Sequence, residues 1–471
     1  HSLTRQLRRL RPDSLIIWGG PEAGSSAAKW LLEEPAVDFI VRGEGEQSLL
    51  ELLRCLNTVE QGTQPDPRRL AAVPGLSYRR ASDDGRTEIC HQPETARLEA
   101  SDWPFPYDPA SLRRDRDRTL YYESSRGCPF GCSYCLSSLD RQLRLRPLDQ
   151  TLRELDWLIE ADVRQVKLID RTFNVDKSRA AAIWRHLTEA ARKKPVRTNF
   201  HFEVAGDQLD DEAIAILSTA PPGLIQLEIG VQTAQPHVLR AINRPCDLDR
   251  LGRQVAALRQ SGNVHLHLDL IAGLPGETWD QFGESFDFVM NLRPHQFQLG
   301  FLKVLPGTAM ATDARRLDFA WQDDPPYEVL RSDQLSFEQL ARLHDIAELI
   351  DHAWNNGLLT GAIDWLMPHW QRPWLFFANW ADWCESRGGF DRSLSPAARA
   401  RLLWQFGLTK LRGREATAQS DWMALAWRDL LRLTYIESGQ KDQPDWLGYW
   451  EQSDDPTLRR RISGDRQALS S

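Results

Sequence analysis

The stretch TLYYESSRGCPFGCSYC at residues 119–135 places Cys128, Cys132 and Cys135 in a CxxxCxxC motif directly after a strand-like run. A cuboidal iron–sulfur cluster takes one thiolate per iron, so a tight triplet with no fourth cysteine nearby leaves one iron open. A zinc site would need a fourth Cys or His at close spacing, and the next one downstream is His186. Three unrelated buried thiols are the remaining alternative. The pattern favours a catalytic cluster over one that only stores electrons.

The motif, with Tyr134 before its last cysteine, resembles that of the radical S-adenosylmethionine (radical SAM) superfamily, which carries it after the first strand of a partial β/α barrel. The resemblance implies that Cys128, Cys132 and Cys135 are catalytic, metal-binding residues that hold a [4Fe-4S] cluster. In this family the reduced cluster cleaves SAM to methionine and a 5′-deoxyadenosyl radical, which removes a hydrogen atom from the substrate. It also implies an electron donor such as flavodoxin or ferredoxin.

Strand-like runs alternate with helical patterns after the motif. Six parallel β/α units of this kind fit a partial (β/α)6 barrel in an α/β protein, and we place that domain at 119–324. The strand-like runs lie at 119–124, 165–170, 198–204, 224–231, 264–271 and 296–304.

The segment before the barrel alternates strand and helix, as the tail of a doubly wound, Rossmann-like α/β domain at 1–60 would. Its Gly-Gly-Pro-Glu at 19–22 and Asp-Phe-Ile-Val-Arg-Gly-Glu-Gly-Glu at 38–46 resemble the cobalamin-binding domain of one radical SAM class. That resemblance implies that Gly19 and Gly20 lie near the nucleotide tail of cobalamin. The histidine-containing loop and serine motif of some related cobalamin domains are absent. The chain begins at His1 and leads almost directly into a buried strand, so we expect a truncated N-terminus.

Two further regions differ in composition. Residues 61–118 predict a linker with a hairpin, including a turn at 82–85. Residues 325–471 predict a helical domain, because twelve of the eighteen tryptophans fall from Trp321 onward, interleaved with Leu and Arg at helical spacing. Core packing is the simplest role for these tryptophans, and covering the substrate is a further hypothesis.

Three successive barrel strands predict one polar and one apolar face, because side chains alternate along a strand. A closed small barrel fills its interior with branched apolar residues, so an inward polar face predicts an open barrel that holds a polar ligand. His201, His265 and His267 are candidates for contact with substrate or cobalamin, or are hydrogen-bonded lining residues. The polar face comprises Asn199, His201, Glu203, Gln226, Glu228, Gly230, Gln232, His265, His267 and Asp269.

Several of these residues resemble the SAM-binding set of the branch that includes oxygen-independent coproporphyrinogen oxidase. The resemblance implies that carboxylates accept the ribose hydroxyls and the methionyl ammonium of SAM, while Arg244 pairs with its carboxylate. At the second strand the family often has a glycine-rich turn that binds the ammonium group of SAM. This chain has a different sequence there, and the side-chain oxygens of Asp170 and Thr172 are the candidate substitutes. The expected cofactor-binding residues are Tyr122, Tyr134, Asp170, Thr172, Glu203, Gln232, Arg244, Asp269, Ile271, Gly19 and Gly20.

Composition limits the possible partners. The net charge of −8 gives no overall electrostatic reason to expect nucleic-acid binding. No run approaches the roughly 20 apolar residues that span a bilayer, so we expect no membrane role. Seven cysteines, three of them clustered, suit a reducing compartment, and we expect a cytoplasmic protein.

The leading interpretation is a radical SAM enzyme acting on an unidentified small molecule or peptide. If it binds cobalamin, methyl transfer to an unactivated carbon or phosphorus is the favoured reaction. The alternatives are cobalamin-independent rearrangement or ring closure, and a non-catalytic iron–sulfur sensor or scaffold. Transfer-RNA thiomethylation would predict a second upstream cysteine set, but only Cys55 and Cys90 precede the motif.

Overall fold

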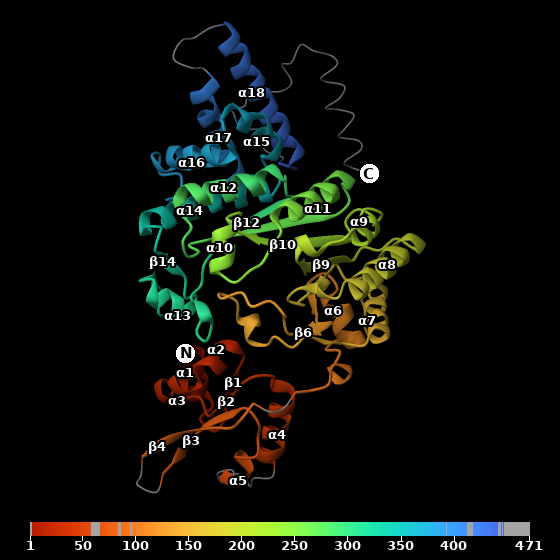
Figure 1. Cartoon of the computed structure of the whole chain (residues 1–471), viewed down its shortest axis with the longest axis vertical. Coiled ribbons are helices and arrows are strands. Elements are labelled where there is room, and N and C mark those ends of the chain that lie inside the picture. The colour runs from red at the N-terminus through yellow and green to blue at the C-terminus, as the bar shows by residue number, and fades with distance from the viewer. Residues whose placement is uncertain are drawn as a thin grey trace. The chain divides into compact units, whose positions relative to one another are not determined.

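The computed structural model describes residues 2–57, 66–82, 86–94, 97–391, 393–411, 418–440, 444 and 446. Most of the turn expected at 82–85 therefore lies outside the described residues. The chain divides into two compact units, one formed by His1–Arg171 with Lys303–Arg316 and the other by Thr172–Leu302 with Leu317–Ser471. Figure 1 labels the helices and strands of both units.

The first unit begins with a four-stranded sheet in the order β1-β2-β3-β4. β1 (Ile17–Gly19) and β2 (Phe39–Val41) are parallel, and the hairpin of β3 (Leu76–Ala81) and β4 (Thr87–His91) continues the sheet in antiparallel fashion. Phe39 and Val41 pack in one apolar cluster with α4 (Gly45–Asn57), while Ile40 packs in another with α3 (Ala27–Glu33). Apolar clusters on both faces confirm the predicted α/β arrangement, and the predicted hairpin is an extension of this sheet.

Six parallel strands follow, as the sequence predicted. The first unit contains β5 (Thr119–Tyr122) paired with β8 (Gln165–Leu168). The second contains β9 (Asn199–Val204), β10 (Ile225–Gln232), β11 (His265–Ala272) and β12 (Gln296–Phe301), in the spatial order β12-β11-β10-β9. Each observed strand falls within one residue of the range expected from the sequence, or inside it.

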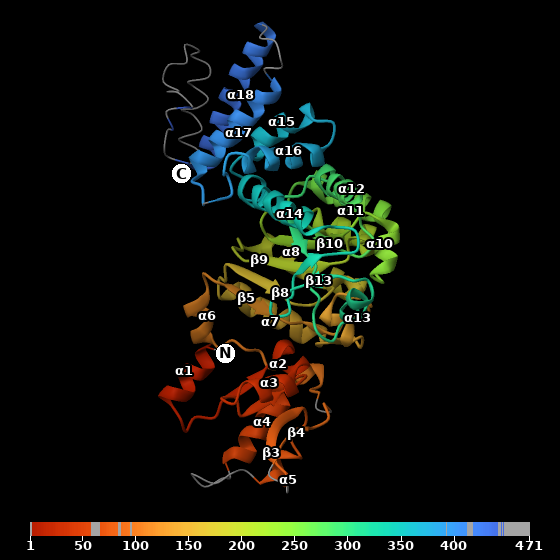
Figure 2. The ribbon, with the colours of Figure 1, turned by 90° about the vertical axis from the view of Figure 1, so that its left-hand side faces the viewer.

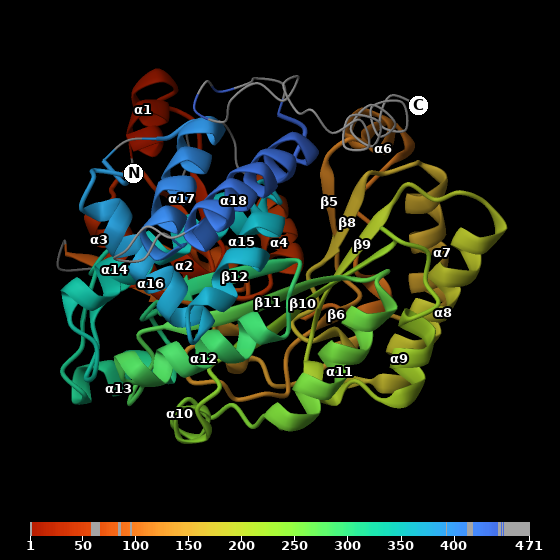
Figure 3. The ribbon, with the colours of Figure 1, turned by 90° about the horizontal axis from the view of Figure 1, so that it is seen from above.

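The strands of the second unit have the predicted polar and apolar faces. In β10, Leu227, Ile229 and Val231 are fully buried, whereas the intervening residues are partly exposed. Figure 3 shows the helices that alternate with these strands along the chain on one side of them, and the rings of Trp184 and Phe202 pack edge to face at 6.0 Å. The apolar face is therefore sealed by helices, which leaves the polar face for the lumen. These helices are α8 (Lys177–Lys193), α9 (Asp211–Leu217), α11 (Leu248–Ser261) and α12 (Trp279–Asn291).

The C-terminal part of the second unit is helical, as predicted (Figure 2). Several of its tryptophans serve as packing residues: Trp380 and Trp427 are buried, and Trp374 lies against Phe286 of α12 with ring centroids 5.4 Å apart, whereas Trp422 is exposed. Gly283 permits this approach, because a Cβ there would lie 2.6 Å from the Trp374 ring. The main helices are α14 (Phe337–Leu349), α15 (Thr360–Leu366), α16 (Pro373–Glu385), α17 (Pro396–Leu411) and α18 (Ala418–Glu437).

A buried carboxyl group fixes the carboxyl end of β10. Glu277 is fully buried, and its Oε1 accepts hydrogen bonds from the Thr233 hydroxyl at 2.5 Å and the Ser285 hydroxyl at 2.9 Å. Burial raises the pKa of Glu277 to about 7, although these hydrogen bonds act in the opposite direction. Because Thr233 follows Gln232 directly, the network determines where Gln232 lies at the end of its strand.

We predict that Glu277 makes the protein less stable as the pH rises. Its folded-state pKa lies above the unfolded value, so its stabilising contribution is full below about pH 4.5 and declines as the pH rises through about 7. Glu277→Gln should flatten the pH dependence of the urea midpoint across this interval. Glu284→Gln, which removes an exposed carboxylate of the helix that follows Glu277, is the control that should leave it unchanged. A wild-type slope retained in Glu277→Gln would contradict the assignment.

Candidate functional site

The three cysteines lie in a tightly shaped loop between β6 (Ser125–Arg126) and β7 (Arg144–Leu145), which pair antiparallel. Cys128 and Cys132 are buried and Cys135 is half-buried, and the three are not joined by disulfides. Gly127 has a φ of +85°, and a Cβ there would lie 2.2 Å from the Gln142 carbonyl oxygen, so only glycine fits. The structure therefore places two buried cysteines and one half-buried cysteine in a single constrained loop, which suits a cluster with three protein ligands and one open iron.

Asp170 anchors the chain that leads into this loop. Its carboxylate accepts hydrogen bonds from the Ser124 amide at 3.0 Å, the Ser124 hydroxyl at 2.7 Å and the Ser125 hydroxyl at 2.5 Å. Asp170 is only 1% exposed. The sequence assigned Asp170 to SAM, and that contact stays a prediction; the observed contacts make it a support of the cysteine loop. Thr172 lies in the second unit.

Arginines connect the cysteine loop with the Gly43–Glu46 turn of the N-terminal sheet. Arg126 lies 3.1 Å from Glu44 and 2.6 Å from Glu46, and Arg144 also pairs with Glu44. The Arg126 guanidinium stacks over Trp103 at 4.6 Å. Burial acts to raise the pKa of Glu46, but the hydrogen bond from Arg126, a backbone hydrogen bond and the charges of Arg126 and Arg144 together outweigh it, and the pKa lies below its ordinary value. Sequence reasoning missed these arginines, although Arg126 lies within the motif stretch.

Arg126, Arg144, Glu44 and Glu46 line an open cavity of about 850 Å³ in the first unit. Gly19 and Gly20, predicted to contact cobalamin, line one side, and Gly127 and Leu136 of the cysteine loop line another. Gly20 has a φ of +91° and a ψ of 171°, a backbone conformation that only glycine adopts readily. The volume is within the range of small-molecule and cofactor sites. The residues fit a large cofactor placed beside the cluster loop.

In the second unit, Gln232 and Arg244 come together at the end of β10. Gln232 has a φ of +69° and lies at a register shift between Gly230 and Gln232. Its amide folds back over Gly230, where a Cβ would lie 2.1 Å from Gln232 Nε2, and Arg244 donates to the Gly230 carbonyl at 2.6 Å. The buried Gln232 Oε1 has no hydrogen-bond partner among the described residues. A strained backbone and an unsatisfied buried acceptor are typical of a ligand site.

The remaining predicted residues are placed as follows. Glu203 of β9 and Asp269 of β11 are half-buried on the polar face, and Asp269 Oδ1 lies 3.0 Å from His267 Nε2. Ile271 is partly exposed at the end of β11 and Tyr134 is half-buried in the cysteine loop. Tyr122 is buried, and its hydroxyl donates to Glu154 of α7 (Leu148–Glu160) at 2.7 Å. Burial is the main cause of its raised pKa. The Tyr122 hydroxyl is therefore already hydrogen-bonded to a helix residue. The contact of Tyr122 with SAM stays a prediction.

We predict that Asp170→Asn disrupts the cysteine loop. An amide nitrogen in place of one carboxylate oxygen would face a serine donor, which leaves a buried donor unsatisfied at a cost of about 1–3 kcal/mol. After anaerobic reconstitution, the iron bound per chain should fall by at least half. Asp149→Asn removes an exposed carboxylate from the same unit and should retain full iron. Full iron and an unchanged melting temperature in Asp170→Asn would contradict the anchoring role.

Two family models match the chain. The Radical SAM superfamily model matches residues 122–289, and a model described as a protein of unknown function, DUF4080, matches residues 316–467. The first range begins just before the cysteine loop and continues through β11 into α12. The second coincides with most of the helical C-terminal region.

Relatives of known description include the cobalamin-dependent radical SAM methyltransferase TokK of Streptomyces tokunonensis. It is 28% identical over 63% of this chain and 44% of its own length. The anaerobic magnesium-protoporphyrin IX monomethyl ester cyclase of Rubrivivax gelatinosus is 26% identical over 61% of this chain and 51% of its own length. The matches thus span about half the length of these relatives.

A solved structure supports the fold. The cobalamin-dependent SAM radical enzyme OxsB, with aqua-cobalamin and SAM bound, superimposes with a TM-score of 0.58 at 16% identity, covering 95% of this chain and 72% of that one. The family match, the cysteine loop and the parallel strands together identify residues 122–289 as a radical SAM domain.

Proposed function

We propose that the chain is a cobalamin-dependent radical SAM enzyme that transfers a methyl group to an unactivated carbon or phosphorus of a small-molecule or peptide substrate. The observation that carries the proposal is the cavity lined by both the Gly19–Gly20 turn and the cysteine loop. It would hold a large cofactor beside the cluster, within a single unit of the chain.

The cysteine thiolates of Cys128, Cys132 and Cys135 would hold the [4Fe-4S] cluster, which supplies the electron that cleaves SAM. Gly127 and the Asp170 carboxylate hold the loop in the shape that presents the three thiols. Burial of Cys128 and Cys132 would also shield two of the three ligands from water. The chain thus provides a loop of fixed shape, partly shielded from water, for this cofactor.

The SAM molecule would take its polar contacts from the second unit. The Gln232 side chain offers an unsatisfied buried acceptor, which can receive a hydrogen bond from an ammonium or hydroxyl group. Glu203 and Asp269 offer carboxylates from the neighbouring strands β9 and β11 on the same polar face. Arg244 is held beside Gln232 by the Gly230 carbonyl, where its positive charge suits the carboxylate of SAM.

Cobalamin, when bound, would supply a methyl carrier. The cavity combines the apolar side chains of Trp18, Leu49 and Leu136 with the charged groups of Arg126 and Glu123, a mixture suited to a large amphiphilic cofactor. The descriptions of TokK and OxsB, both cobalamin-dependent, support this choice.

Radical ring closure is the second candidate, because one relative is described as a cyclase. A sensor or scaffold that only holds a cluster would not need the strained Gln232 and its polar surroundings. No helix in the described part of the chain is long and apolar enough to cross a membrane. For the electron donor we propose flavodoxin or ferredoxin, and for the location the cytoplasm, with no nucleic-acid partner.

SAM cleavage tests the enzymatic part of the proposal. The chain is reconstituted anaerobically with iron and sulfide, and dithionite and SAM are added. We expect 5′-deoxyadenosine to form, and at least a 100-fold lower yield from Cys132→Ser because one cluster ligand is lost. Cys384→Ser, a buried cysteine of α16, is the matched control that should keep the wild-type yield. A cluster of full iron content that never yields 5′-deoxyadenosine would favour the sensor interpretation.

The cobalamin part is tested by filling the cavity. Leu49 and Leu50 are adjacent residues of α4 with 40% and 44% exposure, but only Leu49 lines the cavity. Leu49→Trp should weaken hydroxocobalamin binding at least tenfold, measured by absorbance after gel filtration, because the indole occupies cofactor space. Leu50→Trp should bind as the wild type does. Equal binding by both variants would place cobalamin elsewhere, and no binding by the wild type would favour the cobalamin-independent reaction.

A further inference from the structure

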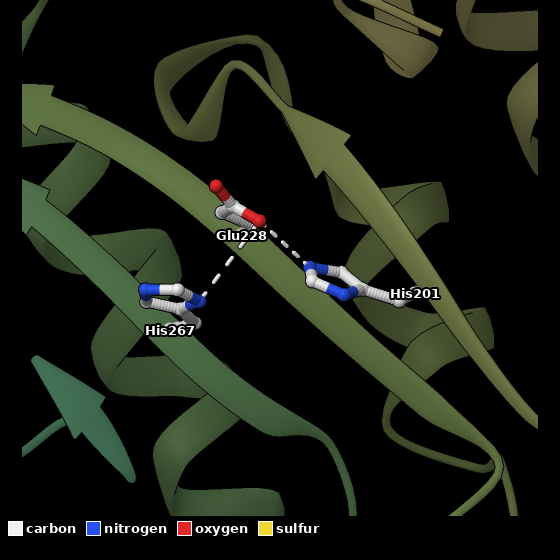
Figure 4. A group of neighbouring side chains, drawn as sticks. All are labelled: His201, Glu228 and His267. Carbon is white, nitrogen blue, oxygen red and sulfur yellow. Dashed lines mark ion pairs between the residues drawn. The ribbon is translucent and has the colours of Figure 1, made fainter. Parts of the chain in front are cut away.

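Two histidines and a glutamate converge on the polar face of the second unit, one from each of three neighbouring strands. His201 of β9, Glu228 of β10 and His267 of β11 each offer one ligand atom, and these atoms lie within 4.8 Å of one another. Figure 4 shows the three side chains turned toward a common point from their separate strands. His201 and His267 are 7% and 5% exposed, so the group is largely shielded from water.

The strand register explains how these residues meet. Glu228 is directly opposite His267 in the parallel pairing of β10 with β11. Gln226 is directly opposite His201 in the pairing of β10 with β9, so His201 lies diagonally across from Glu228 on the same face. All three side chains therefore belong to rigid, fully paired strands, and their convergence does not depend on a loop.

The contacts within the group fit shared coordination better than an ordinary hydrogen bond. His201 Nε2 lies 2.9 Å from Glu228 Oε2, yet this buried nitrogen has no contact with hydrogen-bond geometry among the described residues. His267 Nδ1 lies 3.9 Å from the same oxygen. Ligands bound tetrahedrally at about 2.0–2.1 Å lie about 3.3 Å apart, between these two distances.

His267 has a carboxylate at ion-pair distance from its second ring nitrogen, a position where metal-bound imidazoles usually have one. Its second ring nitrogen, Nε2, lies 3.0 Å from Asp269 Oδ1. A carboxylate on the far nitrogen of a ligating histidine fixes the ring orientation and makes the near nitrogen a better ligand. The other ring nitrogen, Nδ1, faces Glu228. His267 thus has one nitrogen directed toward the proposed metal position and the other toward a carboxylate.

We propose that His201, Glu228 and His267, residues other than the three cysteines, form a second metal site for a divalent first-row transition metal such as Zn²⁺ or Fe²⁺. Two imidazoles and one carboxylate favour these ions over Mg²⁺ and Ca²⁺, which prefer oxygen ligands. Three protein ligands leave a coordination position open for water or for a donor atom of a bound molecule. The site lies on the lumen face, in the strand segment before Gln232 and Asp269.

Zinc binding by the cluster-containing chain tests the proposal. The reconstituted full chain is dialysed anaerobically against micromolar ZnCl₂, and zinc and iron per chain are measured by mass spectrometry. The wild type should bind one zinc more than Glu228→Gln and His201→Gln, whose zinc affinity should fall at least tenfold. Iron per chain should stay constant, which excludes zinc at the cysteines. Zinc should raise the melting temperature of the wild type and not that of these two variants.

His265→Gln is the matched control. His265 is a neighbouring histidine of β11, but its ring stacks on His295 with centroids 5.1 Å apart and it is not one of the three ligands. This variant should retain the extra zinc and the thermal shift. Equal zinc in all variants, or no extra zinc in the wild type, would overturn the proposal. Because two different ligands are replaced separately, a folding failure of one variant leaves the other decisive. The readout is independent of SAM cleavage and of cobalamin.

Discussion

The hydrogen bonds between Asp170 and the two serines before the cysteine loop are the interaction on which the first unit's chemistry depends. One buried carboxylate at the end of β8 receives two hydroxyls and one amide from Ser124 and Ser125, so the loop enters at a fixed position. Gly127 and the Cys128 amide, which donates to the Asp140 carbonyl at 2.9 Å, then set its curvature. The backbone on both sides of the three cysteines is therefore held in place.

In the second unit, too, buried polar groups hold a residue that is proposed to bind a cofactor. Gln232 adopts a left-handed backbone conformation at the end of a strand, and such a conformation persists only where its surroundings impose it. The buried Glu277 carboxyl, bound to Thr233, and the Arg244 guanidinium, bound to Gly230, provide that constraint. In both units, buried polar groups hold the residues proposed to bind cofactors, while apolar packing supports the sheet behind them.

Strand positions and faces could be predicted from the sequence because alternating polar and apolar residues report directly on which side of a sheet is buried. The six strand positions and the polar face of β9, β10 and β11 are confirmed for this reason. The helical nature of the Trp-rich region is also confirmed. The partners of Asp170 could not be predicted from the sequence, because Ser124 lies 46 residues away along the chain. The Asp170 carboxylate was also a chemically reasonable ligand for SAM.

Contacts between segments that are far apart in the sequence could not be predicted either. The stacking of Arg126 on Trp103 and its pairing with Glu44 join three separate parts of the first unit. The sequence named His201 and His267 as candidates, yet only the register showed that Glu228 lies between them.

The central claim is that three cysteines leave one iron of the cluster open to SAM. Mössbauer spectroscopy of the ⁵⁷Fe-reconstituted chain, recorded with and without SAM, tests it most directly. We predict that SAM shifts the spectrum of one iron of the four toward higher coordination and leaves the other three unchanged. A spectrum in which all four irons are unaffected by SAM would contradict the account.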